Sequence, residues 1–269
     1  MAVTKAKSAT RKPWLSATDH PVSATGTKVR FPVEQAGSQG NTAYVGAADL
    51  WASERNLTNY NSDLVAKLTK YHARATHVLE FGAGIGTLAE LWKRSTGVAP
   101  DCVEIDSLQR TVIERRGFRC HESLASVDAT FDLIYTSNVL EHIEDDAYIL
   151  RQLSSKVRPG GGLAVYVPAF PLIYSQFDGK VGHCRRYTKH DLLQKIREAG
   201  FIIQECHFAD CIGFFAWLYI KARDDSSNES REARMKLYDR YIFPISSVLD
   251  VLGCKHLFGK NLLVYAKKP

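Results

Sequence analysis

The stretch from His77 to Gly86, which reads HVLEFGAGIG, predicts the fold of this chain. Val78 to Phe81 is a short apolar run typical of a buried strand, and three glycines follow it at alternate positions. Leu88 then begins a spacing of apolar residues that is typical of a helix. A strand, a glycine turn and a helix in this order open the nucleotide-binding half of a doubly wound α/β domain.

Two acids beside this turn narrow the class of ligand. Glu80 precedes the glycines, where a dinucleotide site has no special need of an acid but an amino or sulfonium group would find a counter-charge. Glu104 ends the next predicted strand, at a spacing where a carboxylate commonly binds a ribose diol; an exposed strand-end carboxylate is the alternative. Thr87 stands where the dinucleotide fingerprint has Gly or Ala, which disfavours a nicotinamide dehydrogenase.

The composition predicts one folded domain with a basic extension. The chain has 269 residues with 45% hydrophobic and 24% charged side chains, as in ordinary globular proteins. Much of the net charge of +6 comes from the first thirty residues, which contain six Lys and Arg residues and a single Asp. We therefore interpret residues 1–38 as a flexible basic tail and residues 39–269 as the folded domain. The near-neutral domain argues against a nucleic-acid partner.

The cysteines and the apolar runs bear on the location of the protein. Six cysteines occur without a CxxC pair or a zinc-site spacing, so we expect reduced thiols and no bound metal. Together with the lack of a signal peptide, this pattern predicts a cytoplasmic protein. The longest apolar run, Ile212–Ile220, is far shorter than the ~20 residues of a membrane-spanning helix. We therefore expect no transmembrane segment.

Strand and helix patterns alternate along the rest of the chain, which predicts a parallel sheet with helices on both faces. Helices over residues 39–75 cap the first strand, and a helical insertion over residues 211–259 precedes the last one. Residues 170–187 form a long aromatic loop without a regular pattern, which we expect to be functional. The predicted strands cover residues 78–81, 101–106, 117–120, 131–138, 163–167, 201–209 and 261–266.

Two histidines are candidates for a general base. His142 follows the fourth predicted strand, although a histidine there is as often a structural partner for a neighbouring loop. His183 belongs to the loop that should cover a second ligand. A base at either position would matter if the group to be modified were a hydroxyl or an ammonium.

The same loop carries the candidate contacts for that second ligand. Arg185 and Arg186 could pair with a carboxylate or phosphate, or instead tie the loop to Asp178 or Asp191. Tyr174 and Tyr187 are further candidate substrate contacts.

Four stretches together resemble the class I S-adenosylmethionine-dependent methyltransferases, over the range from about Tyr44 to Lys268. They are VLEFGAGIG at 78–86, VEID at 103–106, FDLIYTSN followed by LEHI at 131–143, and RPGG at 158–161. The resemblance implies a Rossmann-like, doubly wound sheet of seven strands, mostly parallel with the last antiparallel. It also implies S-adenosylmethionine as the cofactor and S-adenosylhomocysteine as the product.

The resemblance further implies which residues hold that cofactor. Its methionine end would lie over the glycine turn, the ribose at Glu104, and the adenine at Ile105 and near the end of the third strand. The family often has Asp in place of Glu104 and at the third strand. Tyr60 would reach the cofactor from the N-terminal helices, with core packing as the alternative. The implied set is Tyr60, Glu80, Gly82, Ala83, Gly84, Glu104, Ile105, Glu122, Ser123 and Asn138.

The reaction expected from this resemblance is in-line methyl transfer to a small-molecule acceptor, a partly hydrophobic biosynthetic intermediate. A nucleic-acid methyltransferase is the less favoured alternative, because no Asn/Asp-Pro-Pro-aromatic run and no Pro-Cys pair are present. Another alternative is a non-catalytic protein that binds the cofactor and acts through its tail or insertion. The aromatic run Phe214–Tyr219 could line a pocket, pack on the sheet or join subunits of a homo-oligomer.

Overall fold

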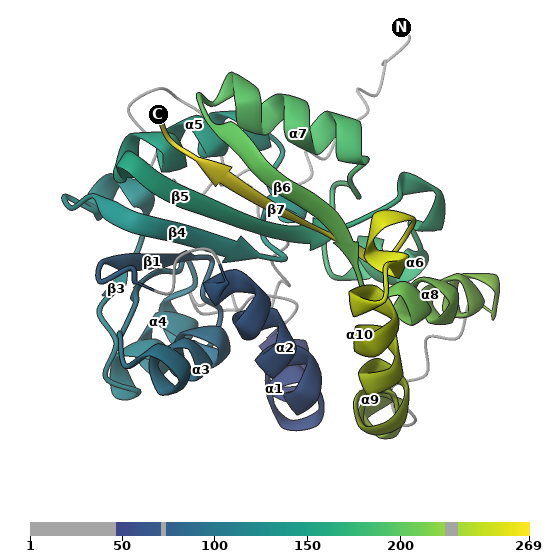
Figure 1. The fold of residues 1–269 in the computed structure, drawn as a ribbon. Coiled ribbons are helices and arrows are strands. Elements are labelled where there is room, and N and C mark those ends of the chain that lie inside the picture. The colour runs from purple at the N-terminus through teal and green to yellow at the C-terminus, as the bar shows by residue number, and fades with distance from the viewer. Residues whose placement is uncertain (1–46, 71–73, 224–230) are drawn as a thin grey trace, which may run out of the picture.

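The computed structural model describes residues 47–70, 74–223 and 231–269. Its centre is one seven-stranded sheet with the strand order β3-β2-β1-β4-β5-β7-β6 (Figure 1). β7 runs antiparallel to both β5 and β6, and the other pairings are parallel. The predicted Rossmann-like fold is therefore confirmed. The strands are β1 (Val78–Phe81), β2 (Asp101–Val103), β3 (Cys120–His121), β4 (Phe131–Ser137), β5 (Val157–Pro168), β6 (Ile202–Ala209) and β7 (Asn261–Lys267).

Helices cover both faces of this sheet. Figure 1 shows α5 and α7 on one face, with α2, α3 and α10 on the opposite side. Successive side chains of a strand point to opposite faces, so Ile134 packs beneath α5 and α7 whereas Leu133 and Tyr135 pack towards α2 and α3. The helices are α1 (Ala47–Asn56), α2 (Thr58–Thr69), α3 (Thr87–Thr96), α4 (Ser107–Arg115), α5 (Asp146–Lys156), α6 (Gln176–Lys180), α7 (Lys189–Glu198), α8 (Cys211–Arg223), α9 (Arg231–Leu237) and α10 (Phe243–Val251).

Two strands begin three or more residues away from their predicted starts. β5 begins at Val157 rather than at residue 163, because the glycines after Pro159 continue the strand instead of ending it. A Cβ on Gly161 would lie 2.9 Å from the carbonyl oxygen of Asp132, so glycine allows β5 to approach β4 there. β3 begins at Cys120 rather than at residue 117, because Gly117 and Phe118 still donate main-chain hydrogen bonds to the end of α4.

The loop at residues 170–187 is more regular than its sequence suggests. It contains the 3-10 helix η3 (Pro171–Ile173) and the helix α6. Ser175 and Asp178 cap α6 reciprocally, each side chain binding the other residue's main-chain N–H. The cap is local, so the pattern Ser-x-x-Asp could have predicted it.

Some of the helices precede the sheet in the chain or lie between its last two strands. α1 and α2 precede the sheet, and α8, α9 and α10 lie between β6 and β7. Residues 1–38, predicted to be a basic tail, lie outside the described residues. No helix in the described ranges is long and apolar enough to cross a membrane.

Candidate functional site

The glycine turn after β1 is built from main-chain contacts. Gly82 and Gly84 have φ values of 77° and 57°, in the left-handed region that favours glycine. The N–H groups of Gly82 and Ala83 donate to the carbonyl oxygen of Val103, at 2.9 and 3.1 Å, which joins the turn to β2. A Cβ on Gly82 would lie 2.3 Å from Cγ2 of Val139, so a larger residue would collide there.

Two buried carboxyl groups flank this turn. Glu80 accepts a hydrogen bond from the hydroxyl of Tyr135 at 3.0 Å, and its burial raises its pKa to about 8. Glu104 accepts from the N–H groups of Gly84 and Asp106, at 2.8 and 3.0 Å, and burial raises its pKa to about 7. A ligand that brings a positive charge and hydroxyl groups would therefore stabilise both groups in their ionised form.

The other predicted cofactor contacts lie at the carboxyl ends of neighbouring strands. Ile105 follows β2 and is 46% exposed. Glu122 follows β3 and is exposed, and Ser123 caps the 3-10 helix η1 (Leu124–Ser126). Asn138 follows β4 and is also exposed. Because β1, β2, β3 and β4 are parallel neighbours, these residues share one edge of the sheet with the glycine turn.

Tyr60 lies elsewhere. Its hydroxyl is 3.0 Å from the hydroxyl of Tyr166 on β5 and 3.3 Å from Nδ2 of Asn261 on β7. β4 separates both of these strands from β1. The side chain projects from α2 into the apolar core, where it packs against Phe243 of α10, which agrees with the core-packing alternative.

The part of α1 that covers the turn was not among the site residues predicted from the sequence. A Cβ on Gly84 would lie 3.2 Å from Cδ1 of Leu50. Glu54, one turn further along α1, accepts a hydrogen bond from Thr87 at 2.5 Å and pairs with Arg116 at 2.9 Å. These contacts join α1 to the start of α3 and the end of α4. The helical pattern was visible in the sequence, but no local signal marks Glu54.

Asn138 connects the glycine turn to a second group of side chains. It has a φ of 54°, and its N–H donates to the carbonyl oxygen of Tyr166 on β5 at 2.9 Å. The chain then turns so that Val139 faces Gly82. The 3-10 helix η2 (Leu140–His142) follows directly and places Glu141 and His142 next to the turn.

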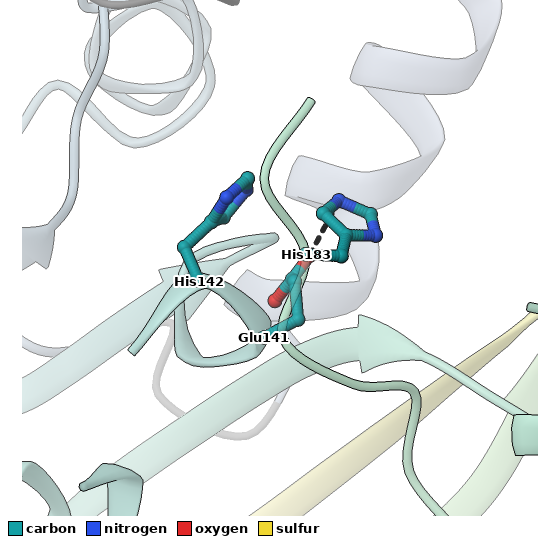
Figure 2. A group of neighbouring side chains, drawn as sticks. All are labelled: Glu141, His142 and His183. Carbon is teal, nitrogen blue, oxygen red and sulfur yellow. Dashed lines mark ion pairs between the residues drawn. The ribbon is translucent and has the colours of Figure 1, made fainter. Parts of the chain in front are cut away.

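Glu141, His142 and His183 form a buried cluster, shown in Figure 2. Glu141 is 0% exposed, and its carboxylate faces the ring of His183 in Figure 2. Its Oε1 is 3.9 Å from Nε2 of His183, and the two ring centroids are 4.7 Å apart. Burial raises the pKa of Glu141 to about 7, although the charge of His183 acts in the opposite direction. Burial, assisted by His183, lowers the pKa of His142 to about 4.

Asp178 holds His183 in this orientation. Its Oδ1 is 2.7 Å from Nδ1 of His183 and accepts from Nε of Arg186 at 3.0 Å. Its other oxygen accepts from the hydroxyl of Ser175 at 2.9 Å. Burial raises the pKa of Asp178, but the hydrogen bonds from His183 and Arg186 outweigh it and hold this pKa below its usual range. Asp178 entered the sequence analysis only as an alternative partner for the loop arginines.

The four predicted substrate contacts separate into two kinds. Arg186 is 5% exposed, pairs with Asp178 at 2.9 Å and packs 4.9 Å from the ring of Trp217. Tyr187 is 1% exposed and donates to Asp146 at 2.6 Å. These two side chains therefore support the loop from within.

Arg185 and Tyr174 keep more contact with solvent. Arg185 pairs with Asp146 at 2.9 Å, not with Asp178 or Asp191, and its side chain is 26% exposed. Tyr174 is 36% exposed and donates to the carbonyl oxygen of His183 at 2.7 Å. Tyr174 therefore contacts the main chain of the cluster residue His183, whereas Arg185 contacts α5 and the loop before it.

Comparisons with known proteins agree with this architecture. A family model described as a methyltransferase domain matches residues 53–205, more than half of the chain. No curated protein matches the chain in sequence. Among solved structures, an S-adenosylmethionine-dependent methyltransferase from Archaeoglobus fulgidus has a TM-score of 0.56 at 18% identity, over 82% of this chain and 99% of that one.

Two further structures share the fold at low identity. Phosphoethanolamine N-methyltransferase 2 of Haemonchus contortus, in complex with S-adenosylmethionine, has a TM-score of 0.56 at 17% identity, over 84% of this chain and 56% of that one. An O-methyltransferase family protein from Burkholderia thailandensis has a TM-score of 0.52 at 12% identity, over 82% of this chain and 59% of that one. The chain belongs to the methyltransferase domain family and is an enzyme that uses S-adenosylmethionine.

Proposed function

We propose that this enzyme transfers the methyl group to a small-molecule acceptor, and that the cluster of Glu141, His142 and His183 promotes loss of the acceptor's proton. One observation carries the proposal. Val139 packs on Gly82 of the glycine turn, and the cluster begins two residues later, so a group able to accept a proton lies beside the cofactor turn. Methyl transfer needs two ligands aligned and shielded from water, which a buried cluster beside the turn favours.

The size of the acceptor is inferred from how closed the cluster is. The side chain of His183 is 13% exposed, and the loop that carries it is held by Asp178 and Arg186 inside the protein. Such a site favours a small molecule over a base within a folded nucleic acid. We propose that Arg185 and Tyr174, the two more exposed of the four predicted substrate contacts, bind the acceptor. Arg186 and Tyr187 support the loop instead.

The cofactor residues proposed from the sequence fit this arrangement, with one exception. S-adenosylmethionine supplies a methyl group on a sulfonium. Glu80 would face the cationic methionine end and Glu104 the ribose hydroxyls. Tyr60 is left out because its hydroxyl is bound to Tyr166 on the far side of β4. The others are Gly82, Ala83, Gly84, Ile105, Glu122, Ser123 and Asn138.

Calorimetric titration of the purified chain with S-adenosylmethionine and S-adenosylhomocysteine tests the cofactor part. We expect micromolar affinity that Glu104→Ala weakens tenfold or more, about 1.4 kcal/mol. Glu114→Ala removes an exposed carboxylate from α4 and should leave the affinity unchanged. Unaltered binding by the Glu104 variant would remove Glu104 from the proposed site.

The acceptor part is tested by release of S-adenosylhomocysteine in the presence of hydroxylated or amino small molecules, with transfer RNA and duplex DNA as competing classes. His183→Ala should lower kcat and leave the affinity for the cofactor unchanged, because His183 belongs to the acceptor side. Turnover on nucleic acid alone would contradict the small-molecule proposal. Binding without any turnover would favour a non-catalytic role.

A further inference from the structure

We propose that Glu141, His142 and His183 bind one divalent transition-metal ion, with Zn²⁺ as the representative species. Each residue offers one ligand atom, and these atoms lie within 4.8 Å of one another (Figure 2). Zinc binds imidazole nitrogen and carboxylate oxygen at about 2.0–2.2 Å, so its ligand atoms are roughly 3.4 Å apart in a tetrahedral site. Side-chain movements of about 1 Å would therefore close these three groups around an ion.

The carboxylate of Glu141 is the first argument for an ion. The side chain is 0% exposed, and among the described residues neither of its oxygens has a hydrogen-bond partner. Its distance of 3.9 Å from Nε2 of His183 is too long for a hydrogen bond. A carboxylate buried in this way is costly unless it is paired or coordinates a metal. An ion bound between the carboxylate of Glu141 and Nε2 of His183 would give both groups a partner.

The orientation of His183 is the second argument. Its Nδ1 donates to Asp178 at 2.7 Å, which leaves Nε2 directed at Glu141. Histidines that ligate a metal commonly donate their other ring N–H to a carboxylate, which sets the tautomer and the ring orientation. Asp178 is itself held by Arg186 and Ser175. The supporting contacts of a metal ligand are therefore already formed by protein groups.

The chemical nature of the donors indicates which ions fit. Two imidazoles and one carboxylate suit zinc and other first-row transition metals better than magnesium or calcium, which prefer oxygen ligands. Three protein ligands leave a coordination position open, as in catalytic zinc sites. The sequence prediction of no bound metal relied on local spacing, and His183 comes from a distant loop that spacing rules do not connect to η2.

The consequence for catalysis rests on the proposed function. An acceptor hydroxyl at the open position would lose its proton to solvent at a lower pH than a free hydroxyl. Its oxygen lone pair would then form the bond to the methyl carbon, while the electrons of the carbon–sulfur bond pass to sulfur and neutralise the sulfonium. In this form His183 acts as a ligand, and it does not take the proton itself.

Metal binding is measured directly, without cofactor or acceptor. The full chain is treated with a chelator and titrated calorimetrically with ZnCl₂, and in parallel with MgCl₂. We expect one Zn²⁺ per chain and much weaker binding of Mg²⁺. Glu141→Gln and His183→Ala should each weaken the Zn²⁺ affinity at least 100-fold. Asp178→Asn should weaken it about 10–100-fold through its contact with His183.

Two controls separate this site from incidental binding. His190→Ala removes an exposed histidine and should leave the affinity unchanged. Cys184→Ser removes a thiol beside the cluster, whose Sγ lies 3.6 Å from the carbonyl oxygen of His142, and should also leave the Zn²⁺ affinity unchanged. Circular dichroism checks that each variant folds. Glu141→Gln preserves shape, so it tests the site even if His183→Ala does not fold.

No stoichiometric binding by the parent chain, or equal affinity in Glu141→Gln, would overturn the metal site. Either result would leave the proposed function intact, with His183 as a free base. Conversely, failure to bind S-adenosylmethionine would contradict the proposed cofactor site and leave a measured metal site standing.

Discussion

The glycine turn and the cluster of Glu141, His142 and His183 are neighbours, yet the chain builds them by different means. The turn uses residues close together in sequence and main-chain hydrogen bonds, such as those from Gly82 and Ala83 to Val103. The cluster takes side chains from η2 and from a distant loop, and ion pairs to Asp178 hold it. A site made of backbone should be sensitive to an added Cβ, whereas a site made of buried charges should be sensitive to loss of one partner.

The largest effect is expected from breaking the ion pair behind the cluster. Arg186→Met removes the guanidinium from Asp178, and removing one partner of a buried pair typically costs about 3–5 kcal/mol. Urea unfolding of the ligand-free chain measures the change. Arg55→Met is the matched control, because the Arg55–Glu232 pair is 56% exposed on both sides and should contribute at most about 1 kcal/mol. Equal losses in the two variants would contradict the role given to Arg186.

A smaller but more specific effect is expected at the turn. In Gly82→Ala the new Cβ would collide with Val139, and the residue would also have to keep a φ of 77°. Together these should lower the free energy of unfolding by about 3 kcal/mol and weaken cofactor binding more than tenfold. Gly97→Ala adds a Cβ at nearly the same φ, 78°, with no atom within 4 Å. Its free energy of unfolding should fall by only about 1 kcal/mol, because of backbone strain, and its cofactor affinity should be unchanged. Unfolding and calorimetric titration of both variants separate collision from strain.

The smallest effect concerns pH. The pKa of Glu80 is raised from 4.5 to about 8, so the folded chain holds a proton that the unfolded chain has released. Its contribution to stability is present below pH 4.5 and is lost as the pH rises through 8. Glu104 and Glu141 act in the same direction up to about pH 7. His142 acts in the opposite direction, but only between about pH 4 and 6.5.

The window from pH 6.5 to 8 therefore isolates the buried acids. The unfolding free energy of the cofactor-free chain should fall across it, and Glu80→Gln should reduce this fall by about 1 kcal/mol. Urea unfolding at several pH values measures both slopes. An unchanged slope in Glu80→Gln would mean that Glu80 is ionised in the folded protein at neutral pH.

The sequence predicted the structure around the glycine turn better than the contacts of the loop at residues 170–187, for a physical reason. Glu80, Gly82 and Glu104 act through the geometry of β1, its turn and β2, and the local pattern of apolar residues and glycines reports that geometry. Arg186 and Tyr187 were candidates for substrate contacts because loop arginines and tyrosines often bind ligands. Their actual partners, Asp178 and Asp146, became visible only when the loop was folded against η2 and α5.

The sequence alone determined the α/β class, the first strand with its glycine turn, and the family to which the chain is similar. Each depends on periodicity or on contacts between residues near one another in the chain. Only the tertiary structure decided that Tyr60 packs against Tyr166 of β5 and Asn261 of β7, that Leu50 covers the glycine turn, and that Glu141 clusters with two histidines. These arrangements join segments far apart in sequence, and the packing of whole elements determines them.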